Sequence, residues 1–277
     1  MLAPAEHDLD ACVARIDAMK IFPVAAVRVI RVSQDPDAIL SDMVQAVSND
    51  PVLAGRVLQV ANSPLVGLRA QVRTLERAVS VLGLMGTRDV TLTALVGMVA
   101  PGVAPWGPML HRDALLTAHL SKLLAQDVPS VDASEAFVTG LLHNLGHLLL
   151  LALEEEATVA LLEKFHDDPA MLHRAEQTHF GFVNAALSAA CVRTWELPES
   201  IAGTVENQSE LPKPGEVSLA VVVLQAAKHV ASATVEGTDP DHLVAAFESY
   251  PHAQLLNLPQ WRIEALMTGV EDILAAL

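Results

Sequence analysis

The sequence predicts an all-α protein made of many short helices. Hydrophobic residues make up 52% of the 277 residues, and Ala, Leu and Val dominate among them. Apolar residues recur three and four positions apart through nearly every segment, which is the pattern of amphipathic helices packed on one another. No segment alternates apolar and polar residues for long enough to predict a strand. The expected architecture is therefore a multi-helix bundle.

Capping residues mark where helices begin. The pairs Asp50-Pro51 and Asp239-Pro240 each offer a side-chain acceptor followed by a first-turn proline. Asp132 with Glu135 has the spacing of a capping box. These caps and the apolar periodicity predict helices at residues 6–19, 23–33, 39–48, 51–62, 75–99, 110–126, 133–150, 152–165, 169–178, 182–195, 199–206, 217–233, 241–248 and 260–275.

Proline and glycine divide the chain near its middle. The segment 101–108, PGVAPWGP, holds three prolines and two glycines and cannot continue a regular helix. We therefore expect two packed helical subdomains, an N-terminal one over residues 1–105 and a second one over residues 106–277. The polar segment 207–216 is expected to be a loop within the second subdomain.

The charge balance argues against nucleic-acid binding and the apolar runs against a membrane span. The chain has 33 acidic and 17 basic residues and a net charge of −16, so its surface would repel a phosphate backbone. The longest apolar stretches, 217–227 and 145–153, are shorter than the roughly 20 residues that cross a bilayer. The first twenty residues lack the basic start and apolar run of a secretory signal.

The two cysteines and two of the tryptophans are expected inside the protein. Cys12 and Cys191 lie in ordinary helical patterns and predict free thiols rather than a disulfide framework. A reducing cytoplasm is the expected compartment. Trp195 and Trp261 are expected to anchor the core.

The segment 141–147, LLHNLGH, carries the most distinctive chemistry. His143 and His147 are four residues apart and project from one helical face, as in the HExxH helix of zinc proteases. That chemistry needs a Glu directly after the first His, and Asn144 stands there with an amide that takes no proton at neutral pH. Two hypotheses stay open: histidines that stabilise a helix end, and a metal or anion role.

Several motifs together resemble one bacterial family. GLLHNLGH, residues 140–147, closely resembles the GLLHDIGK signature of the HD phosphohydrolase superfamily, with Asn144 at the position of the metal-binding Asp. Five further motifs look like the successive motifs of HDOD domains: Ile21–Ala25, Asp35–Ala38, Asn49–Leu53, Val60–Ser63 and Ala78–Gly83. The chain is identified as a member of the HDOD family from about residue 20 to 206. The resemblance implies an HD-domain-like fold in the C-terminal half.

The same resemblance identifies positions that would have held metal. In metal-dependent HD enzymes, an early His, the His-Asp pair and a later Asp hold divalent ions that activate water against a phosphoester. Asp113 stands at the early His position, His143 is retained, and Asn144 replaces the Asp. Downstream, Val183 and Asn184 occupy an Asp and a His position. Amide and alkyl groups do not supply the donors that divalent ions need, so we expect vestigial positions, no metal, no cofactor and no catalytic residue.

Other polar residues near these motifs have simpler interpretations. Asp113 can also be an acid in the first turn of its helix, where the dipole favours it. His111 and His119 fall off register with the family pattern. The segment 206–208, Glu-Asn-Gln, stands where a His pair is common in the family.

The resemblance implies a non-catalytic bacterial signal-transduction module. Such a module would act through protein contacts or ligand sensing and pass a packing change between its two bundles. The expected partner is an unidentified signalling protein, and self-association stays open as a third hypothesis. The alternative is a divergent metal-dependent phosphohydrolase acting on a nucleotide or cyclic dinucleotide, with His143, His147, His111 or Asp113 recruited to an altered metal site.

Overall fold

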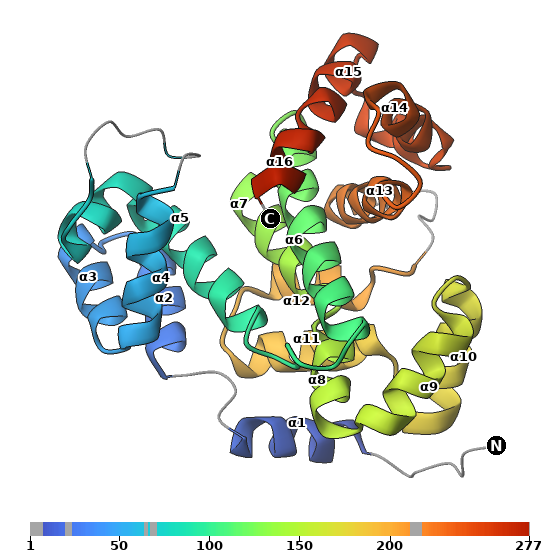
Figure 1. Ribbon diagram of the computed structural model, residues 1–277, viewed down its shortest axis with the longest axis horizontal. Coiled ribbons are helices and arrows are strands. Elements are labelled where there is room, and N and C mark those ends of the chain that lie inside the picture. Colours follow the sequence, from blue (N-terminus) through green and yellow to red (C-terminus); the bar gives the residue numbers. More distant parts are fainter. Residues whose placement is uncertain (1–7, 20–23, 64–65, 67–70, 211–217, 277) are drawn as a thin grey trace.

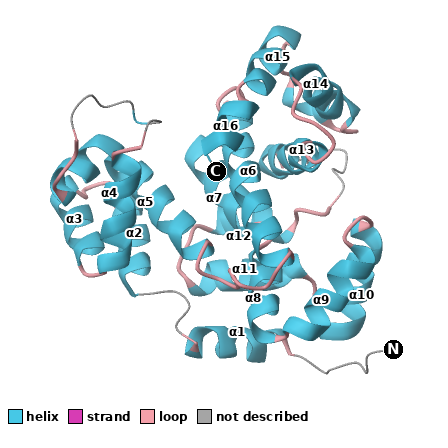
Figure 2. Ribbon diagram, viewed as in Figure 1, coloured by secondary structure: helices cyan, strands magenta, loops and turns pink. Residues whose placement is uncertain are grey.

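The computed structural model describes residues 8–19, 24–63, 66, 71–210 and 218–276, which form helices joined by loops with no strand among them (Figure 2). In chain order the helices are α1 Leu9–Ala18, α2 Val24–Gln34, α3 Leu40–Ser48, α4 Pro51–Ala61, α5 Leu75–Val96, α6 Trp106–Ala125, α7 Ala133–Leu142, α8 Leu145–Leu153, α9 Glu155–Phe165, α10 Pro169–Phe180, α11 Asn184–Thr194, α12 Glu199–Glu206, α13 Leu219–Ala233, α14 Pro240–Ser249, the short 3₁₀ helix η2 Ala253–Leu256, α15 Gln260–Thr268 and α16 Val270–Ala276. The predicted all-α fold is confirmed.

Helices α2 to α5 form an N-terminal bundle, on the left in Figure 1. Its core includes the buried side chains of Val29, Met43 and Val57. The predicted cap of α4 is confirmed, because the Asp50 carboxylate accepts from the backbone N–H groups of Val52 and Leu53 at 2.9 and 3.2 Å. Capping of this kind satisfies donors that the first turn of a helix leaves free.

Helix α5 joins the N-terminal bundle to a central bundle. Its first turns supply Ala78 and Val79 to the N-terminal core, and its last turns supply Leu92 and Val96 to the central core. Between them Gly83 has φ 71° and ψ 179°, a backbone conformation open essentially only to glycine. The part of α5 after this kink contacts both cores, because Leu95 packs in the N-terminal core while Leu92 and Val96 pack in the central one.

The central bundle is built around α6, α7, α8, α11 and α12, with α1 lying along α11 (Figure 1). Helices α6 and α7 approach closely at Gly140, where a Cβ would lie 2.7 Å from the Cα of Ala118. Cys12 and Ile16 of α1 are buried in the same core. The predicted boundary between residues 105 and 106 stays a prediction, although α6 does begin at Trp106.

Helices α13 to α16 cover the outer face of α6. That face presents Leu116, Leu120 and Leu124, which pack with Phe247 of α14 and Met267 of α15. The opposite face of α6 faces the central core. Helix α6 is thus shared by two cores, which places the helices beyond residue 218 directly against the HD-like part of the chain.

Three of the predicted helices differ most from the structure. The helix expected at 133–150 is broken at His143 and Asn144 into α7 and α8, and Gly269 divides the helix expected at 260–275. Helix α6 begins at Trp106 rather than 110, because its first turn tolerates Pro108, whose missing N–H would have no intrahelical acceptor there.

Two details of the sequence prediction are wrong. Trp261 is 68% exposed on α15 and anchors no core, whereas Trp195 is buried as expected. The predicted capping box is only half formed. Asp132 accepts from the N–H groups of Ser134 and Glu135, but the Glu135 carboxylate accepts from the Ser200 hydroxyl instead of returning to Asp132.

Two described stretches are long and apolar enough to cross a membrane by length and composition, Leu75–Val96 and Ala133–Leu153. Of the stretch Ala133–Leu153, the sequence prediction counted only the shorter run 145–153. The longer stretch is 83% buried inside the protein and is interrupted at Asn144, so it packs as a pair of core helices. Leu75–Val96 is 44% buried and joins the two bundles.

Candidate functional site

Polar and charged side chains gather in the central bundle where α7 ends and α8 begins. They come from α6, the α7–α8 junction, α8, α10, α11, the end of α12 and α13. We call this group the polar cluster: Asp113, His143, Asn144, His147, Glu176, Asn184, Gln208 and Lys228. Buried polar groups need hydrogen-bond partners, so the contacts within the cluster show what it can do.

The imidazole of His143 lies between two acceptors. Its Nδ1 is 2.7 Å from the carbonyl oxygen of Gly140, and its Nε2 is 3.1 Å from Oδ2 of Asp113. A carbonyl and a carboxylate only accept hydrogen bonds, and a neutral imidazole has a single N–H. Both contacts are hydrogen bonds together only when the ring is an imidazolium.

The amide of Asn144 completes this pair. Its Nδ2 donates at 3.0 Å to Asp113 Oδ2 and at 3.0 Å to the carbonyl oxygen of Leu110. A carboxylate at this position could not donate either bond. The Asn144 Oδ1 atom has no partner among the residues that the structure describes, although the side chain is only 3% exposed. Asn144 thus supports the ion pair and breaks the helix expected at 133–150.

The side chain of Asn184 connects α8 and α11 through hydrogen bonds. Its Oδ1 accepts from the backbone N–H of His147 at 3.0 Å and from the Ser188 hydroxyl at 3.2 Å, while its Nδ2 donates to the His143 carbonyl oxygen at 3.2 Å. The Ser188 hydroxyl in turn accepts from the N–H of Gly146 at 2.8 Å. The approach is so close that a Cβ on Gly146 would lie 2.5 Å from the Asn184 carbonyl oxygen.

His147 and Glu176 form a second acid and imidazole pair. Nε2 of His147 contacts Oε1 of Glu176, a carboxylate that is 4% exposed. The other oxygen, Oε2, accepts from the backbone N–H of Asn184 at 3.0 Å. Both histidines of the HNLGH motif are therefore paired with a carboxylate of another helix.

Lys228 of α13 brings an ammonium group into the cluster. Its Nζ donates to Oε1 of Gln208 at 2.6 Å, and Nε2 of Gln208 donates to the His143 carbonyl oxygen at 2.8 Å. The charge of this ammonium acts on Asp113 and on Glu176. Lys228 is thereby linked to the α7–α8 junction through a single side chain.

The pKa directions of Asp113 and Lys228 agree with this arrangement. Burial alone would raise the pKa of Asp113, but the hydrogen bond and charge of His143, the charge of Lys228 and the amide of Asn144 together hold it below its usual value. Burial lowers the pKa of Lys228, against the attraction of the two carboxylates. Asp113 is therefore ionised at neutral pH.

The structure brings together all four vestigial positions inferred from the resemblance. His143 contacts Asp113 and Asn184, and Asn144 contacts Asp113. The interpretation of Asp113 as a first-turn acid is wrong, because α6 begins seven residues earlier at Trp106. Their loss of a metal role stays a prediction.

The remaining candidate residues lie in other surroundings. Burial lowers the pKa of His111 and of His119, and the ring of His119 packs edge-on against Phe137. Glu206 forms an ion pair with Arg193 instead of facing the cluster. Of the segment 206–208, only Gln208 joins the polar cluster.

Two members of the polar cluster were missed in the sequence, Lys228 and Glu176, whereas Gln208 lies in the segment 206–208 that the family resemblance singled out. Lys228 could have been identified from the sequence, because it is the only Lys, Arg, Asp or Glu in the helix LAVVVLQAAKHVASA. A lone charge in an apolar helix is expected to have a buried partner. Glu176 lies in a polar segment, and nothing comparable in the sequence marks it.

The donor set does not fit a divalent metal ion. Both nitrogens of the His143 ring are already occupied, Nδ1 by the Gly140 carbonyl oxygen and Nε2 by the Asp113 carboxylate. Asn144 presents amide hydrogens to Asp113, and the amino group of Lys228 interacts electrostatically with the carboxylates of Asp113 and Glu176. Within the described part of the chain, no group of three or more His, Cys, Asp or Glu side chains is arranged to hold a metal.

Sequence comparison connects most of the chain to one family. The family model of the HDOD domain matches residues 19–211. An uncharacterized protein of Treponema pallidum is 26% identical over 199 residues, which are 72% of this chain. The chain spans 39% of the length of that relative.

Solved structures share the fold over nearly the whole chain. A protein of Shewanella amazonensis with the provisional name of phosphohydrolase has a TM-score of 0.75 at 21% identity, with 95% of each chain covered. An HDOD domain protein of unknown function from Geobacter sulfurreducens has a TM-score of 0.70 at 23% identity, covering 97% of this chain and 98% of that one. A Marinobacter aquaeolei protein, provisionally named for signal transduction, has a TM-score of 0.69 at 22% identity, with 97% and 64% covered. At these identities the likeness shows the fold alone.

Proposed function

This chain belongs to the HDOD domain family, and we propose that it is a regulatory module whose phosphohydrolase-like scaffold performs no hydrolysis. In this proposal the polar cluster holds helices together instead of activating water. The module acts by presenting surfaces to another protein or by responding to a small ligand. The structural relative provisionally named for signal transduction supports the regulatory role.

The observation that carries the proposal is that the polar cluster contains its own cation. In this proposal the Lys228 ammonium supplies the positive charge that a metal would otherwise provide to the carboxylates of Asp113 and Glu176. Each carboxylate is also paired with an imidazole, His143 or His147. A cluster with matched charges and occupied hydrogen-bond donors favours stability over metal-assisted catalysis.

We propose that the signal passes between the N-terminal and the central bundle. Helix α5 contributes to both cores and bends at Gly83. A change in how either bundle packs would act on the other through this helix, because packed cores shift between discrete arrangements.

The partner is expected to have a basic surface, since the chain carries a net charge of −16. The buried free thiols of Cys12 and Cys191 favour a reducing compartment.

Metal content and phosphodiester turnover test the proposal directly. The full chain would be dialysed against Mn²⁺ or Mg²⁺, analysed for bound metal and assayed with bis-p-nitrophenyl phosphate and cyclic dinucleotides. We expect metal far below one equivalent and turnover at the rate of buffer containing the same ion. His143→Ala provides the matched control and should leave this background unchanged.

Stoichiometric metal together with turnover that His143→Ala abolishes would overturn the proposal. That outcome would establish the divergent phosphohydrolase instead. Bound metal without turnover would also contradict the structural role of the cluster, because Lys228 and the metal would compete for the same carboxylates.

A further inference from the structure

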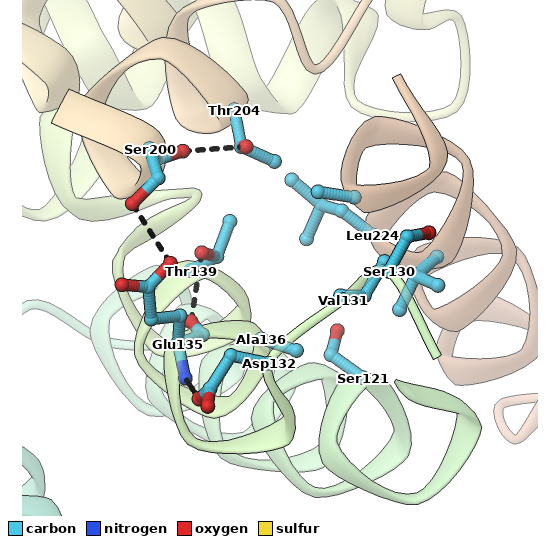
Figure 3. A pocket seen from close by; sticks show the side chains of 12 residues that line it. Ser121, Ser130, Val131, Asp132, Glu135, Ala136, Thr139, Ser200, Thr204 and Leu224 are labelled. Atoms are coloured by element: carbon cyan, nitrogen blue, oxygen red, sulfur yellow. Dashed lines mark hydrogen bonds between the residues drawn. The ribbon is translucent and has the colours of Figure 1, made fainter. Parts of the chain in front are cut away.

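A cavity of about 110 Å³ opens between the N-terminal end of α7 and helices α6, α12 and α13 (Figure 3). Its floor is formed by buried side chains such as Ser121, Thr204 and Leu224. Its rim carries exposed residues, among them Asp132 and Ser200. The cavity therefore has a closed, partly apolar base and a polar entrance, which is the build of a small-molecule site.

The hydroxyl of Ser121 lies on the floor of this cavity without a partner. The side chain is 1% exposed, and its Oγ makes no hydrogen bond to any residue that the structure describes. Figure 3 shows this oxygen directed into the cavity. A buried hydroxyl without a partner costs free energy, so a group that fills the cavity and bonds to Ser121 is favoured.

Three other hydroxyl groups that line the cavity have already used their hydrogens. Thr139 donates to the Glu135 carbonyl oxygen at 2.8 Å, and Thr204 donates to the Ser200 carbonyl oxygen at 2.6 Å. The Ser200 hydroxyl donates to Oε2 of Glu135 at 2.7 Å, as the dashed lines in Figure 3 mark. The oxygens of these three hydroxyls and of the Glu135 carboxylate can only accept, so a ligand that bonds to them has to bring donors.

The negative charge of the cavity wall also favours a ligand that brings hydrogen-bond donors. The carboxylates of Asp132 and Glu135 both line the cavity. Arg88 reaches the neighbouring Ser134 carbonyl oxygen at 3.0 Å, but an ion pair with Asp89 at 2.8 Å matches its charge. An anionic ligand such as a nucleotide would be repelled, whereas a cation would be attracted.

We propose that this cavity binds a small organic ammonium ion that also carries a hydroxyl, an amino alcohol in chemical class. The ammonium group has three donors for the Glu135 carboxylate and the neighbouring hydroxyl oxygens. The ligand hydroxyl bonds to Ser121. Since a 150 Å³ cavity accepts benzene, the present volume holds about four or five non-hydrogen atoms.

The cavity is one helical turn from the polar cluster on two helices. On α7, Thr139 precedes His143 by four residues, and on α13, Leu224 precedes Lys228 by four. A ligand between α7 and α13 would change the distance between these two helices. The same distance is held by Gln208, which bridges the His143 carbonyl oxygen and Lys228. The binding itself does not depend on the polar cluster being catalytically silent.

Binding can be measured by methyl NMR on the full chain labelled at Ala, Val and Leu. Ethanolamine at pH 7 is the probe, and ethylene glycol and KCl are the neutral and the inorganic comparisons at equal ionic strength. We expect saturable shifts of the Ala136, Val223 and Leu224 methyl groups with ethanolamine alone, with a dissociation constant in the millimolar range or tighter.

Three substitutions locate the binding. Glu135→Gln keeps an acceptor for Ser200 but removes the charge, and should weaken binding about tenfold or more. Ser121→Ala should weaken it about threefold, the effect of one neutral hydrogen bond. Glu163→Gln, which makes the same charge change on the exposed face of α9, should leave binding unchanged.

Four outcomes would overturn the inference. They are the absence of saturable shifts with ethanolamine, equal binding of ethylene glycol, the same shifts with KCl, and a Glu135→Gln variant that binds as the wild type does. None of these outcomes depends on metal content or turnover, so the binding experiment and the test of the proposed function are independent of each other.

Discussion

The exchange of a carboxylate for an amide at Asn144 changes what its neighbours can do. An Asp at this position would add a negative charge beside Asp113, whereas the Asn144 amide donates to that carboxylate at 3.0 Å. The effect is to stabilise the charged form of Asp113 without a metal. Nε2 of His143 contacts the same carboxylate oxygen of Asp113, Oδ2, at 3.1 Å.

The stability of the protein should depend on the ionisation of Asp113. Because the fold lowers its pKa, this carboxylate contributes stability that is complete above the unfolded pKa of about 3.9 and is lost as the pH falls through the folded value. The gap in unfolding free energy between wild type and Asp113→Asn should therefore be constant above about pH 5 and shrink below about pH 4. Urea unfolding at a series of pH values measures this gap.

The exposed Glu163→Gln variant is the control for that series. Its unfolding free energy should stay within about 0.5 kcal/mol of the wild-type value near neutral pH. A wild-type to Asp113→Asn gap that does not change with pH would contradict the role assigned to the ion pair.

Lys228→Met should lower the unfolding free energy by about 1–3 kcal/mol, because the buried Oε1 atom of Gln208 loses its donor. The exposed Lys164→Met on α9 is the matched control and should change it by less than about 0.5 kcal/mol. Thermal or urea unfolding of the two variants at pH 7 gives the comparison. A fully stable Lys228→Met would mean that Lys228 does not hold the cluster together.

At the scale of helices, close contacts at glycine position the polar cluster. Gly140 lets α7 lie against the backbone of α6, and Gly146 lets α8 approach the backbone of Asn184. Both glycines flank the α7–α8 junction that carries His143 and Asn144. The positions of α7 and α8 therefore depend on the missing side chains of these glycines as well as on apolar burial.

Gly140→Ala tests this contact. Its Cβ would lie 2.7 Å from Thr117 O and Ala118 Cα, which are backbone atoms that cannot turn aside, so we expect a loss of about 1–3 kcal/mol in unfolding free energy. Gly55→Ala on the exposed face of α4 meets nothing within 4 Å and should instead gain about 0.5–1 kcal/mol. Chemical denaturation measures the unfolding free energy of both variants. An equal change in the two variants would contradict the close packing assigned to Gly140.

At the scale of the whole molecule, sequence-distant helices complete the central bundle. Helix α1 precedes the N-terminal bundle in the chain, yet Cys12 and Ile16 are buried in the central core beside α11. Helices α13 to α16 follow the family match at residues 19–211, yet they supply Lys228 to the polar cluster and one wall of the cavity.

The reactivity of Cys191 should report on the docking of α1. Burial raises the pKa of this thiol to about 12, so it holds almost no thiolate and should react slowly with a disulfide reagent in the native protein. A chain beginning at residue 20 loses α1, and its Cys191 should react faster while the helical content stays that of a folded protein.

The full-length Cys12→Ser variant is the control for this measurement, because it keeps α1 and should leave Cys191 slow. Dithionitrobenzoate kinetics with circular dichroism as the folding check would serve. Unchanged slow reaction in the shortened, folded chain would show that α1 does not shield Cys191.

The sequence by itself determined the helical class, most helix positions and the family. These depend on local periodicity, caps such as Asp50, and short motifs, which are all properties of neighbouring residues. It also identified Asp113, His143, Asn144 and Asn184 through the resemblance, but it did not show that Asn144 ends α7.

Only the tertiary structure decided the electrostatics of the site and the existence of the cavity. Gln208 bridges Lys228 and the His143 carbonyl oxygen because α13 packs on α6. Ser121 and Glu135 line one cavity because α6 and α7 pack closely at Gly140. Trp261 showed the same limit, since an aromatic residue in an amphipathic pattern is buried only if another helix covers it. Periodicity defines the face of a helix, and packing between distant segments decides what that face meets.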